Sequence, residues 1–206
     1  MTKRQAIVLA AGSFIHPIKK SILEQLQSQL SVINITYFLQ SQGYRLEQPV
    51  VSSYLSDLRQ IGLVSFKRNG KFIYYETNKG KSQLLSTFQS RYEALIHAQQ
   101  PALRHPNMHS DVMQGKNLPL YAAAMLIMDN SKTKKILELY KKWDEICPSI
   151  ICDELRDERF NSVISNKLRD MRKANLIYIS RACGRFIWYA LNKPVIELLT
   201  QFESEF

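Results

Sequence analysis

The sequence predicts a mainly α-helical fold with small β-hairpins (α+β), built from two copies of one unit. The first observation is a repeat: residues 51–78 read VSSYLSDLRQIGLVSFKRNGKFIYYETN, and residues 164–192 read ISNKLRDMRKANLIYISRACGRFIWYALN. The second is that each copy opens with apolar residues at helical spacing, and the third is that two β-rich segments follow. A duplicated helix-and-hairpin unit therefore organises this chain of 206 residues.

The two copies align at two successive offsets. Val51 aligns with Ile164 at an offset of 113, and five of the fourteen positions from there to Val64 are identical. One inserted residue then raises the offset to 114, so that Gly70 aligns with Gly184 and the tyrosine-rich segments after them also match. The similarity therefore covers the helix and the hairpin alike.

The first copy begins with a helix whose end is marked by glycine. Val51, Leu55 and Leu58 recur at i, i+4 and i+7, which gives the helix one apolar face. Gly62 follows, and glycine favours the left-handed conformation that commonly ends a helix. The second copy has Asn175 there, and asparagine is the next best residue for that conformation.

Two predicted strands follow the helix, Leu63–Lys67 and Phe72–Tyr75, and residues 68–71 (RNGK) form the turn between them. Asn-Gly is a strong hairpin signal. In the second copy the hairpin is predicted within residues 176–191. A helix followed by a hairpin with a basic tip is typical of a winged helix-turn-helix, so the sequence predicts two tandem winged helix-turn-helix domains related by internal duplication.

Three segments resemble the ArsR-type bacterial repressors: residues 16–23 (HPIKKSIL), 48–55 (QPVVSSYL) and 58–64 (LRQIGLV). The family often has histidine at the position of Tyr54, and the second copy has Lys167 there. The resemblance implies a DNA-binding repressor. In that family the flanking helices form a homodimer, so the resemblance implies an intramolecular pseudo-dimer here, with a further homodimer through the same helices left open.

The first domain is predicted to span residues 1–98. Gly43 closes its third helix, and Pro49 suits the first turn of its fourth. The expected helices span residues 5–15, 19–30, 31–42, 48–61 and 81–98.

A linker is predicted at residues 99–117, which contain Pro101, Pro106 and Gly115. The second domain, residues 118–206, repeats the order of the first. Its expected helices span residues 118–129, 132–143, 150–157 and 161–174, with a final helix opened by Pro194.

The formal net charge is +10, which makes a polyanionic partner plausible. The charge is uneven, because residues 1–100 carry +7 and residues 101–206 carry +3. Charge alone does not identify a nucleic-acid binder, but basic residues on a predicted winged helix favour double-stranded DNA.

The candidate DNA-binding residues lie on the two predicted recognition helices and the two hairpins. Polar side chains of a helix can read base edges in the major groove, and hairpin cations can contact phosphates. On the helices the candidates are Gln48, Ser52, Ser53, Ser56 and Arg59, with Asn161, Ser165, Asn166, Lys167 and Arg169 in the second copy. On the hairpins they are Lys67, Arg68, Lys71, Arg181 and Arg185.

The three cysteines, Cys147, Cys152 and Cys183, form no paired framework, as expected in a reducing cytoplasm. Some ArsR-type relatives carry a Cys-x-Cys metal site where Cys152 stands, but this chain has a single cysteine there. His105 and His109 have ligand-like spacing, yet they lie in the predicted linker. We therefore expect no metal and no cofactor.

Membrane and enzyme functions are not expected. No apolar run reaches the ~20 residues that a membrane span needs. The apolar segment 6–11 aligns with the interior segment 120–125, so it is predicted to be a structural helix and not a signal peptide. No nucleophile–base pair stands out. The sequence thus predicts a sequence-specific transcriptional regulator acting as a repressor, with a winged-helix protein–protein interaction scaffold as the alternative.

Overall fold

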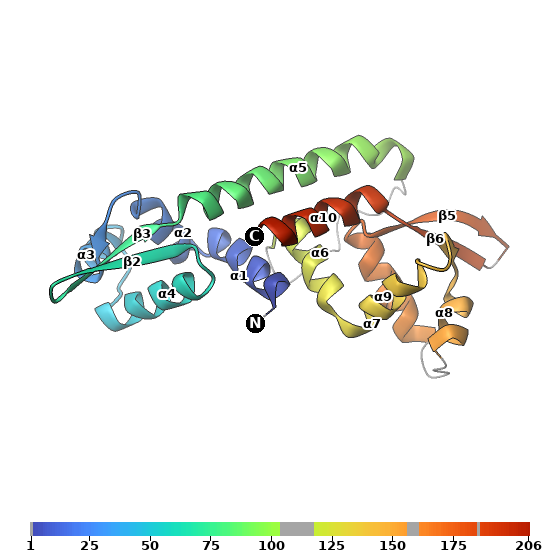
Figure 1. Ribbon diagram of the computed structural model, residues 1–206, viewed down its shortest axis with the longest axis horizontal. Coiled ribbons are helices and arrows are strands. Elements are labelled where there is room, and N and C mark those ends of the chain that lie inside the picture. The colour runs from blue at the N-terminus through green and yellow to red at the C-terminus, as the bar shows by residue number, and fades with distance from the viewer. Residues whose placement is uncertain (1, 104–117, 156–160, 185) are drawn as a thin grey trace. The chain divides into compact units, whose positions relative to one another are not determined.

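The computed structural model describes residues 2–103, 118–155, 161–184 and 186–206 (Figure 1). The chain is mostly helical with two small antiparallel three-stranded sheets, which confirms the predicted α+β class. It divides into two compact units: unit 1 comprises Met1–Phe88 together with Phe206, and unit 2 comprises Gln89–Glu205. The boundary falls inside one helix, before the end of the predicted first domain at residue 98.

Unit 1 contains four helices, three strands and the start of a fifth helix. The helices are α1 (Lys3–Ile15), α2 (Pro17–Gln25), α3 (Val32–Ser41), α4 (Gln48–Gln60) and α5 (Lys79–Leu103), and the strands are β1 (Leu30–Ser31), β2 (Val64–Asn69) and β3 (Phe72–Thr77). The strands pair in the order β1-β3-β2. Figure 1 shows α4 beside the β2–β3 hairpin.

Unit 2 has the same order of elements. Its helices are α6 (Leu120–Asp129), α7 (Ser131–Leu139), α8 (Pro148–Leu155), α9 (Asn161–Lys173) and α10 (Lys193–Glu205), and its strands are β4 (Glu145–Ile146), β5 (Ile177–Cys183) and β6 (Phe186–Leu191). The strands pair in the order β4-β6-β5, as in unit 1.

Three expectations about element bounds are wrong. The helix expected at 19–30 ends at Gln25, because the chain then forms β1, in which Leu30 pairs with Tyr75. The helix expected at 132–143 ends at Leu139, ahead of β4, which was also not expected. The helix expected at 81–98 continues to Leu103, into the predicted linker, and the rest of that linker (104–117) lies outside the described residues.

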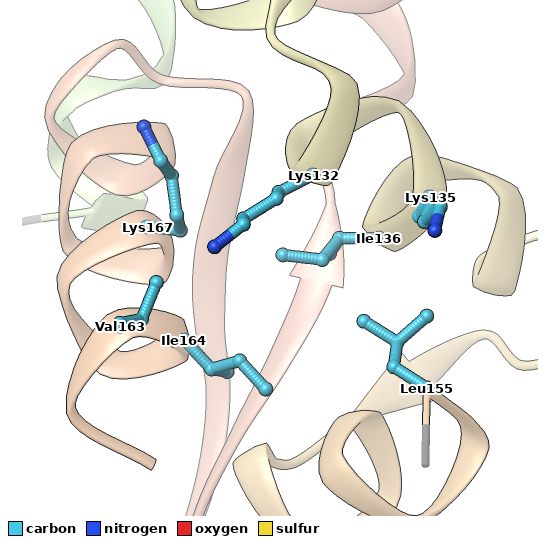
Figure 2. Close-up of a pocket in the computed structure, with 7 residues that line it drawn as sticks. All are labelled: Lys132, Lys135, Ile136, Leu155, Val163, Ile164 and Lys167. Carbon is cyan, nitrogen blue, oxygen red and sulfur yellow. The ribbon is translucent and has the colours of Figure 1, made fainter. Parts of the chain in front are cut away.

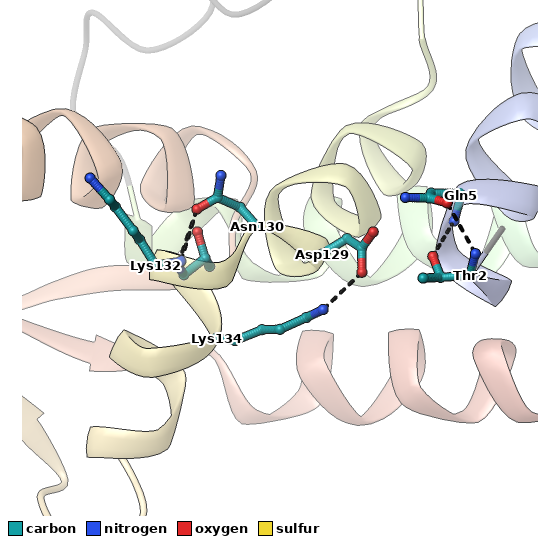
Figure 3. A network of polar contacts seen from close by, with 7 residues as sticks. Thr2, Gln5, Asp129, Asn130, Lys132 and Lys134 are labelled. Carbon is teal, nitrogen blue, oxygen red and sulfur yellow. Dashed lines mark hydrogen bonds and ion pairs between the residues drawn. The ribbon is translucent and has the colours of Figure 1, made fainter.

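Side-chain caps fix where several helices begin. At α1, Thr2 Oγ1 accepts from the Gln5 N–H, and Gln5 Oε1 accepts from the Thr2 N–H, which forms a capping box. His16 caps α2 through Nδ1, and Asn130 caps α7 by accepting from the backbone of Lys132 and Thr133 (Figure 3). His16 and Asn130 therefore hold the same place in their units.

The predicted left-handed helix ends are confirmed. Gly62 has φ +75° and Asn175 has φ +56°. The residue after each donates to a carbonyl five positions back, Leu63 to Leu58 at 2.9 Å and Leu176 to Met171 at 2.9 Å. This bond is typical of a Schellman motif, so α4 and α9 end in the same way.

The two hairpins share a turn and differ by one bulge. Gly70 (φ +59°) and Gly184 (φ +56°) open the two turns. Lys67 pairs with Tyr74 in one hairpin, and Arg181 pairs with Trp188 in the other, so the two cations share one register. The pairing of β5 shifts between Ile179 and Arg181, which is where the inserted residue of the second copy is accommodated.

Each unit has an aliphatic core, and that of unit 2 also contains aromatic rings. In unit 1, Ile7, Ile22, Ile35 and Leu55 are among the fully buried side chains. In unit 2, Tyr92 of α5 packs edge-on to Tyr121, which packs edge-on to Phe202, and the Tyr92 hydroxyl donates to the Ala174 carbonyl at 3.1 Å. The second half of α5 therefore belongs to the core of unit 2.

Membrane-span criteria were applied to the described residues. No single helix there is long and apolar enough to cross a membrane. By length and composition α1 and α2 pass the criteria only as a pair, and they are bent by 87° at their junction.

Candidate nucleic-acid interface

Helix α4 is fixed by its apolar face and presents a polar face outward. Val51, Leu55 and Leu58 are fully buried. Ser52 and Ser53 are exposed between them, as the helical spacing predicts. The other candidates on this helix are Gln48 and Arg59, which are exposed, and Ser56, which is half-buried. Short polar side chains therefore line the outer face of α4.

Helix α9 has the same orientation within its own unit. Ile164, Leu168 and Met171 are buried, while the candidates Ser165, Asn166 and Arg169 are exposed. Asn161 opens the helix, and its side chain is not among those described. Lys167 differs from the other candidates because it is half-buried and faces α7.

In unit 1 the candidate Lys67 on β2 is paired with a carboxylate. Its Nζ lies 3.2 Å from Glu76 Oε1, and Gln29 Nε2 donates to Glu76 Oε2 at 2.9 Å. The hydrogen bonds from Gln29 and Lys67 hold the pKa of Glu76 below its ordinary value. Lys67 would have to leave this carboxylate to contact a phosphate fully.

The other cations near this hairpin lie against aromatic rings or the backbone. The Arg59 guanidinium lies 5.1 Å from the Phe66 ring centroid, and Lys71 Nζ lies 5.7 Å from that of Phe72. Arg68 Nε donates to the Gly70 carbonyl at the turn. Arg59 thereby connects the end of α4 to the hairpin, with a modest cation–π attraction at an exposed position.

In unit 2 the hairpin cation is also paired, by a different strand. Arg181 Nε on β5 donates to Glu145 Oε2 on β4 at 2.8 Å. Its guanidinium also lies 4.4 Å from the Trp188 ring centroid. The remaining candidate, Arg185, lies outside the described residues.

Sequence reasoning missed the two carboxylates, Glu76 and Glu145, that pair with the candidate cations. Glu76 could have been found from the hairpin register, because it faces Ser65, two residues before Lys67 on the same side of β2. Glu145 had no such signal, since it lies on a two-residue strand that the sequence pattern does not mark.

Both hairpins also expose apolar side chains. Phe66, Phe72 and Ile73 are 46%, 49% and 40% exposed in unit 1. In unit 2 the exposed apolar residues of the hairpin are Tyr178, Phe186 and Ile187. Such groups can contact sugars and bases, but they also suit a protein partner.

The inner side of α4 carries a small cluster with α2. The Tyr54 ring lies 5.5 Å from the His16 ring and 5.9 Å from Lys19 Nζ. Lys19 Nζ also pairs with Asp57 at 2.9 Å. Tyr54 is therefore directed toward α2 and is not part of the outer polar face.

The cysteines lie in three different environments. Cys147 is buried, with its Sγ 3.0 Å from Ser149 Oγ, and Cys183 is exposed at the end of β5. Cys152 on α8 is half-buried, and desolvation together with the nearby Asp153 raises its pKa, which disfavours the thiolate that binds metals. Among the described residues, no three His, Cys, Asp or Glu side chains gather closely enough to hold a metal ion; His105 and His109 lie outside them.

Comparison with known proteins adds no assignment. No protein-family model matches the chain, and no curated protein matches it. The functional interpretation therefore depends on the geometry of α4, α9 and the two hairpins.

Proposed function

We propose that the chain is a sequence-specific DNA-binding transcriptional regulator, built as a tandem duplication of a winged helix-turn-helix and acting as a repressor in the cytoplasm. One observation carries the proposal. In each unit a helix held by a buried apolar face presents polar side chains outward and is followed by a hairpin with basic residues. The resemblance of three segments to ArsR-type repressors supports it, and the net charge of +10 favours a polyanion.

In this proposal α4 and α9 are the recognition helices. Ser52 and Ser53, and Ser165, Asn166 and Arg169, would meet base edges, while Lys71 and Arg181 would contact the phosphate backbone. The two helices would act as an intramolecular pseudo-dimer on half-sites about 34 Å apart, one turn of the duplex. Because the outward residues differ between α4 and α9, the half-sites would form an imperfect palindrome.

Fluorescence anisotropy tests the proposal, with labelled duplexes from the upstream region of the gene and a scrambled duplex of equal length. We expect tighter binding to an upstream duplex, and affinity that falls steeply with salt by about 0.9 log units per log unit for each phosphate contact. Footprinting should show two protected half-sites. Equal affinity for all duplexes, or no binding at low salt, would contradict the proposal.

A charge-matched pair of variants localises the contact. Lys71→Ala at the hairpin turn should lower the salt slope by about 0.9. Lys79→Ala removes the same charge at the start of α5, and the six residues of β3 separate it from the turn, about 20 Å at the rise of a strand. The Lys79 variant should leave the slope unchanged.

A second candidate function is a protein-interaction scaffold. The exposed apolar side chains of the hairpins, Phe66, Phe72 and Ile73 in unit 1 with Tyr178, Phe186 and Ile187 in unit 2, favour it. Substituting Phe72 by Ser discriminates the two functions. Capture of a protein partner that is lost in this variant, together with unchanged DNA affinity, would favour the scaffold.

A further inference from the structure

Unit 2 contains a cavity of about 80 Å³ between α7, α8 and α9 (Figure 2). Its apolar wall is formed by Ile136, Leu155, Val163 and Ile164. Its other lining residues are three lysines: Lys132, Lys135 and Lys167. A cavity with an aliphatic wall and several ammonium groups suits a ligand that has an apolar part and a negative charge.

The lysines come from two helices. Lys132 and Lys135 lie on α7, and Figure 2 shows Lys132 extending across the cavity toward α9, which carries Lys167. Among the described residues, no carboxylate lies within ion-pairing distance of Lys135 or Lys167. Like charges gathered around one cavity repel each other, and a bound anion would turn that repulsion into attraction.

Unit 1 shows that the fold does not require these lysines. Alignment of the caps His16 and Asn130 matches Lys132 with Ile18 and Lys135 with Ser21, and alignment of the starts of α4 and α9 matches Lys167 with Tyr54. All three positions are uncharged in unit 1. There the Tyr54 ring packs toward α2, near His16 and Lys19.

We propose that this cavity binds a small aliphatic carboxylate, with its carboxylate among the three lysines and a short branched chain against Ile136, Leu155, Val163 and Ile164. At roughly 10–15 Å³ for each water-sized site, the cavity has room for a ligand of about six heavy atoms. Binding would connect α7 to α9 through the anion. Since Lys167 is also a candidate DNA contact, the ligand would compete with a phosphate for its ammonium; this consequence alone rests on the proposed function.

The test titrates the full chain with isobutyrate at constant ionic strength and measures the thermal unfolding midpoint and the amide chemical shifts of α7 and α9. We expect saturable stabilisation by isobutyrate. The neutral isostere isobutyramide should bind at least about tenfold more weakly, the effect of losing one charge-assisted hydrogen bond. Acetate lacks two methyl groups and should also bind about tenfold more weakly.

Variants localise the site within unit 2. Lys167→Tyr places the residue of unit 1 in the cavity and should abolish binding, and Lys135→Ser should weaken it about tenfold. Lys134→Ser removes a charge from the same helix at a residue that does not line the cavity, and it should bind isobutyrate normally. If Lys167→Tyr does not fold, as judged by circular dichroism, Lys167→Met removes the charge and keeps a flexible chain.

Three outcomes would overturn the proposal: isobutyramide binding as tightly as isobutyrate, acetate or inorganic phosphate binding equally well, or unchanged binding in the Lys167 variant that folds. None of these measurements uses DNA. A chain that binds isobutyrate but no duplex would overturn the proposed function and leave this site intact.

Discussion

Units 1 and 2 place a cation at the same register of the hairpin and pair it with a carboxylate from different strands. In unit 1 Lys67 pairs with Glu76 of β3, the neighbouring strand. In unit 2 Arg181 pairs with Glu145 of β4, and Ala190 occupies the position that Glu76 has in unit 1. The ion pair has been kept while the residue that supplies its negative charge has changed.

The sheet geometry explains why the two changes occur together. The order β4-β6-β5 places β6 between Arg181 and Glu145, so the arginine must reach across about 10 Å, two strand spacings. A small residue on β6, Ala190, leaves room for the crossing side chain, and Trp188 supports the guanidinium at 4.4 Å. The lesson is that the short third strand of each sheet, and not only the hairpin, determines how the hairpin cation is held.

The largest expected effects test whether α4 and α9 are held in the same way. Leu55→Ala and Leu168→Ala each remove a buried side chain, and each should lower the free energy of unfolding by about 2–5 kcal/mol. Chemical denaturation measures the effect. The two tryptophans of the chain, Trp143 and Trp188, both lie in unit 2, so tryptophan fluorescence follows that unit. A tryptophan transition that Leu168→Ala does not move would contradict the packing of α9.

The outward faces of the two helices should differ in specificity. Arg169 is exposed on α9, and the aligned residue on α4 is the half-buried Ser56. If Arg169 reads a guanine, Arg169→Ala should reduce discrimination in one half-site by about 1–3 kcal/mol. Ser56→Ala should have a smaller effect, confined to the other half-site. Binding assays on operators mutated in each half-site separate the two, and a single half-site untouched by changes in α9 would refute the paired arrangement.

The helix ends of the two units give a smaller effect. Gly62→Ala should cost about 1–2 kcal/mol, because alanine disfavours the left-handed conformation. The new Cβ would meet Lys81 Nζ at 2.8 Å, but the end of that flexible side chain can move away. Asn175→Ala should be similarly unfavourable, whereas Asn175→Gly should be nearly neutral. Chemical denaturation of the three variants checks this order, and a strongly destabilised Asn175→Gly would show that the asparagine side chain has another role.

The features that the sequence predicted are those encoded by local patterns. The buried face of α4 follows from the spacing of Val51, Leu55 and Leu58, and its end follows from Gly62. The hairpin turn follows from Asn-Gly, which needs no distant contact.

The features that the sequence did not predict depend on distant residues. Strands β1 and β4 have two residues each and are defined only by pairing with β3 and β6, far along the chain. Glu145 pairs with Arg181, which is 36 residues away. The lysine-lined cavity combines side chains from three helices, and no spacing within one helix indicates that they meet.

The smallest expected effect concerns the pH dependence of the ion pair in unit 1. The hydrogen bonds from Gln29 and Lys67 lower the pKa of Glu76 in the folded chain. A carboxylate with a lowered pKa stabilises the fold above its ordinary pKa, and that contribution is lost as the pH falls through the lowered value. NMR titration of the Glu76 side chain should therefore give a midpoint below that of an ordinary glutamate.

Gln29→Ala should raise the pKa of Glu76 toward its ordinary value, because Gln29 supplies the largest of the interactions that lower it. Lys67→Ala should raise it as well, by removing a hydrogen bond and a positive charge. Ser41→Ala, on an exposed residue of α3 that bonds only its own helix, is the control and should leave the titration unchanged. A Glu76 midpoint that neither Gln29→Ala nor Lys67→Ala moves would mean that Lys67 is not held by this carboxylate in solution. Its ammonium would then be available to a phosphate without first breaking a pair, and the contrast between β3 in unit 1 and β4 in unit 2 would lose its basis.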